Sequence, residues 1–212
     1  MKLPTPILCL CTDRTHLRGR TLTQCVEDAV AGGVTIVQLR EKTAATEEFY
    51  TLAASLRDTT SRLHVPLIIN DRLDIALSCG ADGLHIGQTD MPLHAARRLC
   101  GPNMIIGVSA STVEEARSAE QGGADYIGAG AVFPTSSKDD VEHILGLDGL
   151  AAICAAVKIP VVAIGGITAD NARAAIAHGA AGVAAISAIL APQDAAAAAA
   201  LFYRNLGRIV TG

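Results

Sequence analysis

The segment from Gln38 to Lys42 places an amide, a guanidinium and an ammonium group at every second position. In an extended chain this alternation points Gln38, Arg40 and Lys42 to one side, while Leu39 points to the other. Two neighbouring cations are suited to binding an oligophosphate. A solvated loop with a surface ion pair is the alternative that this pentapeptide leaves open.

Two carboxylates, Asp71 and Asp90, each follow an apolar run further along the chain. Carboxylates beside phosphate-binding cations suit Mg²⁺ bridging a diphosphate, because Mg²⁺ takes few protein oxygens and completes its octahedron with phosphate and water. The sequence therefore predicts one Mg²⁺ per subunit, with Asn70 placed to bond an uncharged ring of the substrate. A helix N-cap is the alternative for either aspartate, since Asp favours that position.

Hydroxyl groups dominate two later segments. Ser109 follows an apolar run and could donate to a phosphate oxygen, although serine before a helix is often only a cap. The segment after Gly128 ends in three hydroxyls and a lysine, namely Thr135, Ser136, Ser137 and Lys138. Glycine-rich ends around such a cluster are typical of a lid that closes over an anion. An exposed charge run is the alternative for Lys138, because acidic residues follow it directly.

A repeated phrase indicates the elements that must position these groups. At several places a helical stretch ends at glycine, small or acidic residues follow, and a β-branched run begins. Glycine fits the left-handed position that closes a helix, and an unbroken apolar run is typical of a strand buried on both faces. Strands are expected near residues 7–12, 34–39, 66–70, 82–86, 104–108, 125–129, 160–164 and 182–186. The expected helix N-caps are Thr21, Thr46, Thr112 and Thr168.

Eight alternating units in 212 residues indicate an α/β fold, a TIM (β/α)8 barrel formed by a single domain over residues 1–212. In such a barrel the active site lies at the carboxyl ends of the strands, where the polar groups described above fall. Loops after the seventh and eighth strands commonly hold phosphate on backbone N–H groups, so Gly165, Gly166 and Ser187 predict a second anion site. A tight turn without a ligand is the alternative for the two glycines.

Composition excludes several classes of partner. Half of the residues are apolar but only 3% are aromatic, so aliphatic side chains must fill the core. With a net charge of −4 and no basic block, the chain lacks the surface that nucleic acids or anionic membranes require. The first residues lack a signal-length apolar stretch, so we expect a cytoplasmic protein with reduced cysteines. Small-molecule substrates are the expected partners, and a homo-oligomer remains open.

As a set, the motifs QLREK, IND, DGLHIGQTD, GVS, YIGAGAVFPTSSK and AIGGI resemble the thiamin phosphate synthase family, in order and across nearly the whole chain. The resemblance implies a transferase that joins hydroxymethylpyrimidine diphosphate to hydroxyethylthiazole phosphate, plain or carboxylated, and releases pyrophosphate with Mg²⁺ bound. No protein nucleophile is needed, because pyrophosphate leaves readily once its growing charge is neutralised.

The resemblance also assigns roles by position. The pyrimidine diphosphate would contact Gln38, Leu39, Arg40, Glu41, Lys42, Asn70 and Ser109, with Lys138 reaching the diphosphate. The thiazole phosphate would contact Thr135, Ser136, Ser137, Gly166, Ile186 and Ser187. Asp71 and Asp90 would hold Mg²⁺, and the expected catalytic groups are Arg40, Lys42, Ser109 and Lys138.

Two other functions are considered. A thiazole tautomerase on the same barrel would use a histidine after the fifth strand, whereas Ser109 is followed there by Ala110, Ser111 and Thr112. A phosphate-ligand sensor would need only the second anion site and would leave the aspartate pair unexplained. His85 is expected to pack or bond locally rather than to touch a ligand.

Overall fold

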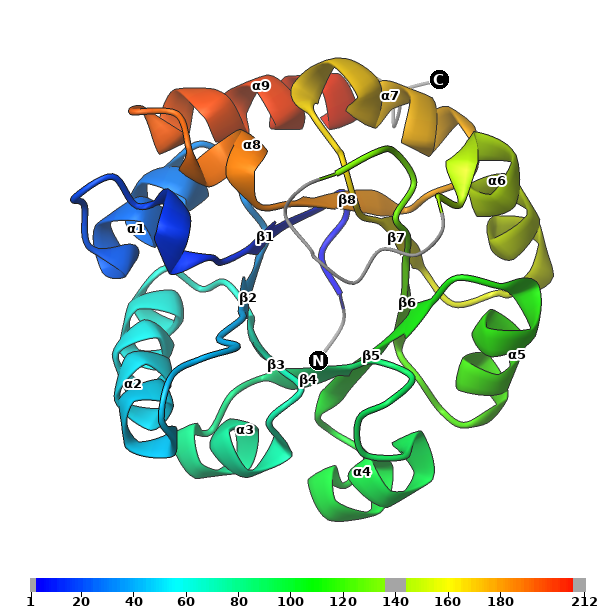
Figure 1. The fold of residues 1–212 in the computed structure, drawn as a ribbon, viewed down its shortest axis with the longest axis horizontal. Helices are drawn as coiled ribbons and strands as arrows, with labels where there is room; N and C mark the ends of the chain where they lie inside the picture. Colours follow the sequence, from blue (N-terminus) through cyan, green and yellow to red (C-terminus); the bar gives the residue numbers. More distant parts are fainter. Residues whose placement is uncertain (1–2, 136–143, 208–212) are drawn as a thin grey trace.

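Eight parallel strands close into a barrel in sequence order, with β8 hydrogen-bonded to β1 (Figure 1). The structure is a computed structural model that describes residues 3–135 and 144–207. The strands are β1 Ile7–Cys11, β2 Ile36–Leu39, β3 Leu67–Asn70, β4 Gly83–Ile86, β5 Ile105–Ala110, β6 Tyr126–Ala129, β7 Val161–Ala163 and β8 Gly182–Ala185. Each overlaps one of the expected strands, so the predicted TIM barrel is confirmed.

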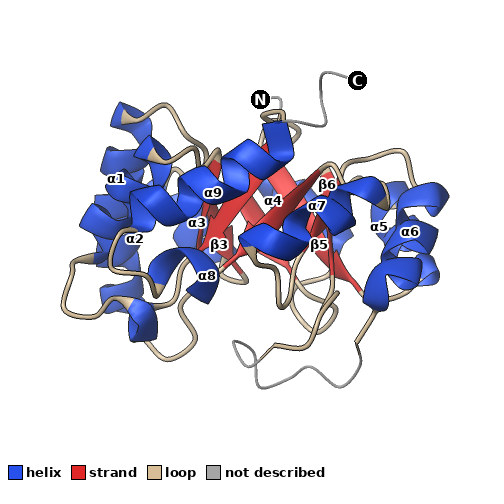
Figure 2. Ribbon diagram, turned by 90° about the horizontal axis from the view of Figure 1, so that it is seen from above, coloured by secondary structure: helices blue, strands red, loops and turns tan. Residues whose placement is uncertain are grey.

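Helices surround the barrel and cover the outer face of the strands (Figures 1 and 2). They are the 3-10 turn η1 Arg14–His16, α1 Leu22–Ala31, α2 Thr46–Arg62, α3 Leu73–Cys79, α4 Leu93–Cys100, α5 Val113–Gln121, α6 Gly146–Ala156, α7 Ala169–Ala177, α8 Ser187–Leu190 and α9 Ala195–Gly207. Among the described residues, none of these helices has both the length and the hydropathy needed to cross a bilayer.

Three of the four expected N-caps are confirmed. Thr21, Thr112 and Thr168 each accept a hydrogen bond from the backbone of the third helical residue, in reciprocal capping boxes. The expectation for Thr46 is wrong, because α2 has Ala45 as its N-cap and Thr46 is already its first residue. The Thr46 hydroxyl instead accepts a hydrogen bond from Arg72 at 3.2 Å.

Strand alternation divides the apolar side chains into two layers. One layer lies between strands and helices and contains most of the leucines, including Leu39, which is fully buried. The other layer fills the barrel interior and includes Cys9, Cys11 and Tyr126. The interior is therefore lined by few polar groups, and those few must be hydrogen-bonded to one another or exposed to a ligand.

Two aspartates hold the end of the barrel opposite the strand carboxyl ends. Asp125, just before β6, accepts from the Ile106 N–H at 2.7 Å and from Arg97 of α4 at 2.6 Å. Asp82, just before β4, accepts in the same way from the Leu67 N–H at 2.9 Å and from Arg57 of α2. We call each arrangement an aspartate bracket. Each bracket ties a helix to two strands away from the polar groups of the mouth.

Candidate active site

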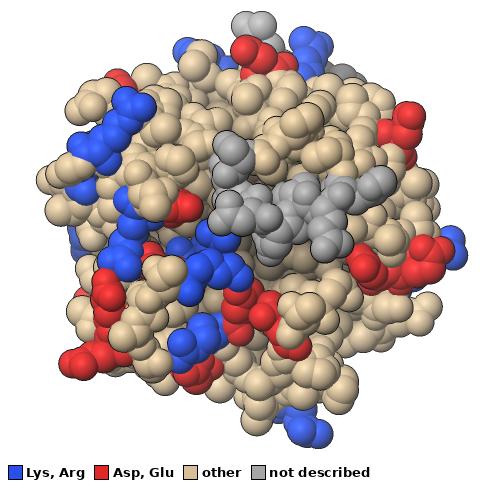
Figure 3. All heavy atoms as spheres, viewed as in Figure 1, with Lys and Arg blue, Asp and Glu red and all other residues tan. Residues whose placement is uncertain are grey.

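Charged side chains meet at the carboxyl ends of β1 to β4. Lys42 Nζ lies 2.6 Å from Asp71 Oδ2, and Arg40 Nη1 lies 3.8 Å from Asp13 Oδ2. In the space-filling view, basic and acidic side chains adjoin near the middle of this face, over the ends of these strands (Figure 3). The structure thus brings Arg40 and Lys42 to the same mouth as Asp71.

The two aspartates are not the helix caps that the sequence left open. Asp71 has a left-handed φ of 64° before the N-cap of α3, Arg72, and no side chain caps that helix. Asp90 accepts from the Gly87 N–H at 2.7 Å, while the N-cap of α4 is Pro92. A non-glycine residue in the left-handed region is uncommon, and such residues cluster at functional sites.

The electrostatics of Asp71 fit a cation site. Burial raises the pKa of its carboxyl above the ordinary value, and the neighbouring Asp90 adds to the rise while Lys42 opposes it. Asp90 thus disfavours the charged form of Asp71, and a divalent cation held by both carboxylates would favour that form instead. Across residues 3–135 and 144–207, no cluster of three or more His, Cys, Asp or Glu is placed for a metal. The described residues that could hold a divalent cation here are the neighbouring carboxylates Asp71 and Asp90.

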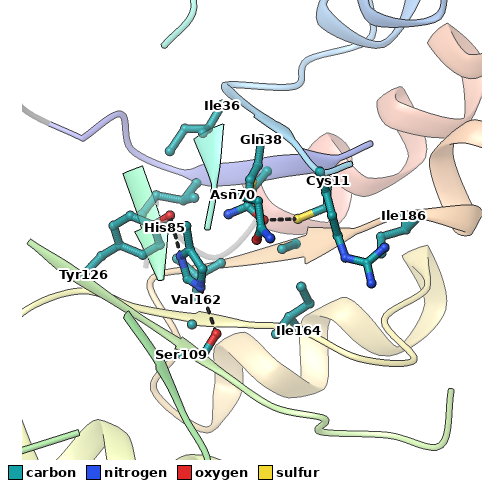
Figure 4. A pocket seen from close by; sticks show the side chains of 15 residues that line it. Cys11, Ile36, Gln38, Asn70, His85, Ser109, Tyr126, Val162, Ile164 and Ile186 are labelled. Carbon is teal, nitrogen blue, oxygen red and sulfur yellow. Dashed lines mark hydrogen bonds between the residues drawn. The ribbon is translucent and has the colours of Figure 1, made fainter. Parts of the chain in front are cut away.

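Beneath the charged groups, a pocket opens into the barrel interior (Figure 4). Gln38 and Asn70 line it, and both side chains are buried. Cys11 Sγ donates to Gln38 Oε1 at 3.1 Å, which fixes the amide in one orientation. Apolar residues form the remaining walls, among them Ile36 and Val162. Such a pocket suits an uncharged ring bonded by a few amides.

A buried histidine connects two further residues of this pocket. His85 Nδ1 lies 2.9 Å from the Tyr126 hydroxyl, and its Nε2 lies 2.9 Å from Ser109 Oγ (Figure 4). The expected local bonding of His85 is confirmed. Ser109 lies within β5 and the N-cap of α5 is Thr112, so Ser109 is not a helix cap. Sequence reasoning assigned no role to Tyr126, one of three tyrosines in the chain.

Two of the expected site residues have side chains that are buried or paired within the protein. The Leu39 side chain is fully buried in the layer between strands and helices. Glu41 accepts from Arg14 Nε at 2.8 Å and from Nη2 at 2.9 Å, so its carboxylate is already neutralised.

A second pocket lies at the ends of β7 and β8. It brings together Thr135, Gly166, Ile186 and Ser187, as the sequence led us to expect. The expected residues Ser136, Ser137 and Lys138 lie outside the described residues. Arg18, which sequence reasoning missed, lines an adjoining groove that shares Thr135, Gly166 and Ser187 with this pocket.

Glycine is required at position 166 by packing as well as by conformation. Gly166 has a φ of 63°, and a Cβ there would lie 2.4 Å from the Pro134 carbonyl oxygen. Its own carbonyl accepts from Asn171 Nδ2 at 2.9 Å. The loop after β7 is therefore held against the loop after β6. The tight turn at Gly166 also forms part of the pocket wall.

Fold and site together define the class of this protein: a TIM-barrel enzyme with charged groups and two pockets at its mouth, suited to phosphorylated small molecules. The sequence profile of thiamine monophosphate synthase matches residues 8–189. The chain belongs to that family. The expected enzyme activity, thiamine-phosphate synthesis, is thereby confirmed, and the tautomerase and sensor alternatives are not favoured.

Individual relatives agree with the family match. The chain is 50% identical over 187 residues to the thiamine-phosphate synthase of Clostridium novyi, covering 88% of this chain and 92% of the relative. It is 52% identical over 193 residues to that of Moorella thermoacetica, covering 91% and 90%. The solved thiamine phosphate pyrophosphorylase from Pyrococcus furiosus superposes with a TM-score of 0.88 at 40% identity, over 98% of both chains.

Proposed function

We propose that the chain joins hydroxymethylpyrimidine diphosphate to hydroxyethylthiazole phosphate at the barrel mouth, giving thiamin phosphate and pyrophosphate. The observation that carries this proposal is a shared wall. Ile164, Ala184 and Ile186 line both the interior pocket and the pocket after β7 and β8. Molecules bound in the two pockets would therefore meet across one apolar surface, as a condensation of two substrates requires.

The charged groups after β2, β3 and β4 are the proposed diphosphate side. Arg40 and Lys42 would bond the phosphate oxygens and oppose the charge that grows as pyrophosphate leaves. Asp71 and Asp90 would hold one Mg²⁺. When bound, this ion supplies further neutralisation of the diphosphate. Ser109, at the end of β5, would donate a hydrogen bond to the same substrate.

The interior pocket is the proposed pyrimidine site. Its amides, Gln38 and Asn70, would bond the ring edge, and its apolar walls would exclude water from the exocyclic methylene carbon. The bond from this carbon to the diphosphate oxygen breaks, and its electron pair leaves with pyrophosphate. The thiazole nitrogen then supplies the pair for the new carbon–nitrogen bond. This route requires no protein nucleophile.

The pocket after β7 and β8 is the proposed thiazole phosphate site. Gly166 and Ser187 would approach the monophosphate through their backbone, and Arg18 lines the adjoining groove. Thr135 adds a hydroxyl from the loop after β6. We propose that the chain works as one domain over residues 1–212, in the cytoplasm, on small molecules rather than on nucleic acid or membranes.

The test is direct product formation. Both phosphorylated substrates are mixed with the protein in buffer containing Mg²⁺, and thiamin phosphate and pyrophosphate are quantified by chromatography. We expect equal amounts of the two products, and almost none after chelation with EDTA or when either substrate is omitted. A protein that forms no thiamin phosphate under any of these conditions would contradict the proposal. Running plain and carboxylated thiazole phosphate in parallel identifies the preferred form.

A further inference from the structure

Three side chains from three strands form a buried hydrogen-bonded row that ends at the mouth. Tyr126 of β6 contacts His85 of β4 at 2.9 Å, and His85 contacts Ser109 of β5 at 2.9 Å. Tyr126 is 5% exposed and His85 is 7% exposed. Figure 4 shows the row crossing the pocket from Tyr126 to Ser109. Buried polar rings in such a row require defined donors and acceptors.

The backbone leaves room for these two rings at two glycines. A Cβ on Gly107 would lie 2.1 Å from Tyr126 Cζ, and a Cβ on Gly128 would lie 2.9 Å from His85 Cε1. Any other residue at these positions would displace the rings. The backbone of Ser109 is also fixed, because its carbonyl accepts from Gln88 Nε2 at 2.6 Å. The hydroxyl direction of Ser109 therefore depends on the proton of His85.

Cys11 and Gln38, next to the inner end of the row, indicate which of its atoms donate hydrogen bonds. Cys11 donates to Gln38 Oε1, which leaves the Gln38 amide N–H groups to donate. Burial raises the pKa of Tyr126 well above its usual range, so the phenol keeps its proton, and a hydrogen bond from Gln38 only partly opposes this rise. Because the phenol keeps its proton, Tyr126 can donate it to His85 Nδ1, which lies 2.9 Å away.

We infer that Tyr126 aims the Ser109 hydroxyl at the substrate by fixing the tautomer of His85. Tyr126 O–H donates to Nδ1, so the imidazole carries its proton on Nε2 and donates it to Ser109 Oγ. The single proton of Ser109 then points into the mouth as a donor. In the opposite tautomer, Ser109 would donate to His85 and present only lone pairs to an anionic diphosphate.

This inference rests on the proposed function, since it takes the diphosphate as the group that Ser109 meets. Tyr126 and His85 are positioning residues, because they act through the serine. Losing the Tyr126 hydroxyl should therefore weaken diphosphate binding as much as losing the Ser109 hydroxyl, although Tyr126 is at the far end of the row.

The first measurement is the tautomer of His85 in the resting protein. Ring ¹⁵N chemical shifts from NMR distinguish Nε2–H from Nδ1–H, and the His85→Asn variant identifies the resonance among the six histidines. We expect Nε2–H in the unsubstituted protein and a loss of that preference in Tyr126→Phe. An Nδ1–H tautomer in the unsubstituted protein overturns the inference, even if the variant fails to fold.

The second measurement is calorimetric binding of inorganic pyrophosphate in the presence of Mg²⁺. We expect Tyr126→Phe and Ser109→Ala to weaken binding by similar factors, about tenfold each. The double variant should lose no more than either single variant, because both changes remove one interaction. Tyr203→Phe, at a tyrosine that is 42% exposed, is the matched control and should bind as the unsubstituted protein does.

The two measurements separate the inference from the proposed function. Additive losses in the double variant, or unchanged binding in Tyr126→Phe, would overturn the relay from Tyr126 to Ser109. If the unsubstituted protein does not bind pyrophosphate at all, the proposed function fails at its diphosphate side. The NMR result still decides the tautomer in that case, because it requires no ligand.

Discussion

The two sides of the barrel mouth are lined by different kinds of chemical group. The side at β2, β3 and β4 consists of charged side chains, such as Lys42 and Asp71, which form an ion pair. The pocket at β7 and β8 has no ionisable side chain among its described lining residues and consists of glycines, hydroxyls and apolar walls. One side thus depends on side-chain charge, and the other on the shape of the backbone.

The largest effect should follow from breaking the charged side. Asp71→Asn removes a carboxylate while keeping a residue that tolerates the left-handed backbone at this position. We expect turnover to fall on the order of 10² or more, because charge stabilisation of the leaving group is lost. Steady-state rates across a Mg²⁺ titration measure it. Asp58→Asn, at an exposed aspartate of α2, is the control. Unchanged turnover in Asp71→Asn would remove this residue from the proposed metal site.

A smaller and more selective effect should follow from changing the backbone side. Gly166→Ala places a Cβ 2.4 Å from the Pro134 carbonyl oxygen and forces the loop after β7 to move. We expect the KM for thiazole phosphate to rise about tenfold, the effect of losing roughly 1.4 kcal/mol of binding. The KM for the pyrimidine diphosphate should stay nearly unchanged.

The Gly80→Ala variant tests the effect of a left-handed backbone without a steric clash. Gly80 has a φ of 65°, close to the 63° of Gly166, but nothing lies within 4 Å of its Cβ position. This variant should lose about 1–2 kcal/mol of stability from the left-handed backbone alone, with both KM values kept. Equal KM changes in the two alanine variants would mean that backbone shape at Gly166 does not define the site.

The smallest effect on turnover should come from the aspartate bracket at the far end of the barrel. Asp125→Asn removes the charge that binds Arg97 and weakens the bond to the Ile106 N–H. We expect a loss of about 1–3 kcal/mol in the free energy of unfolding, measured in urea, because a charged hydrogen bond is weakened. The kcat at 25 °C should remain that of the unsubstituted protein. A large fall in kcat without a loss of stability would connect this end of the barrel to the chemistry.

The contrast between the two sides also explains what the sequence could predict. The charged side is visible as residue types: strand alternation puts Arg40 and Lys42 on one side of their strand, and the barrel rule brings Asp71 of the next strand to the same mouth. The backbone side was found only because a barrel fixes where the last two loops lie. The fold itself could be predicted because the repeated glycines and β-branched runs are local signals that the sequence shows directly.

Long-range partners were beyond sequence reasoning. Glu41 was expected to face a substrate, but Arg14, 27 positions earlier, binds it. The contact between His85 and Tyr126 spans 41 positions and depends on strand register. Periodicity indicates that both rings face the barrel interior, but not which nitrogen meets which hydroxyl. Thr46 failed as a cap because the helix began one residue earlier than its side chain suggested.

The wall formed by Ile164, Ala184 and Ile186 has a kinetic consequence. Because these residues line both pockets, the joined product would occupy both at once and act as a bisubstrate inhibitor. Thiamin phosphate would then compete with either substrate alone. Release of its two halves from the two pockets, rather than the bond-forming step, would then limit the rate of turnover.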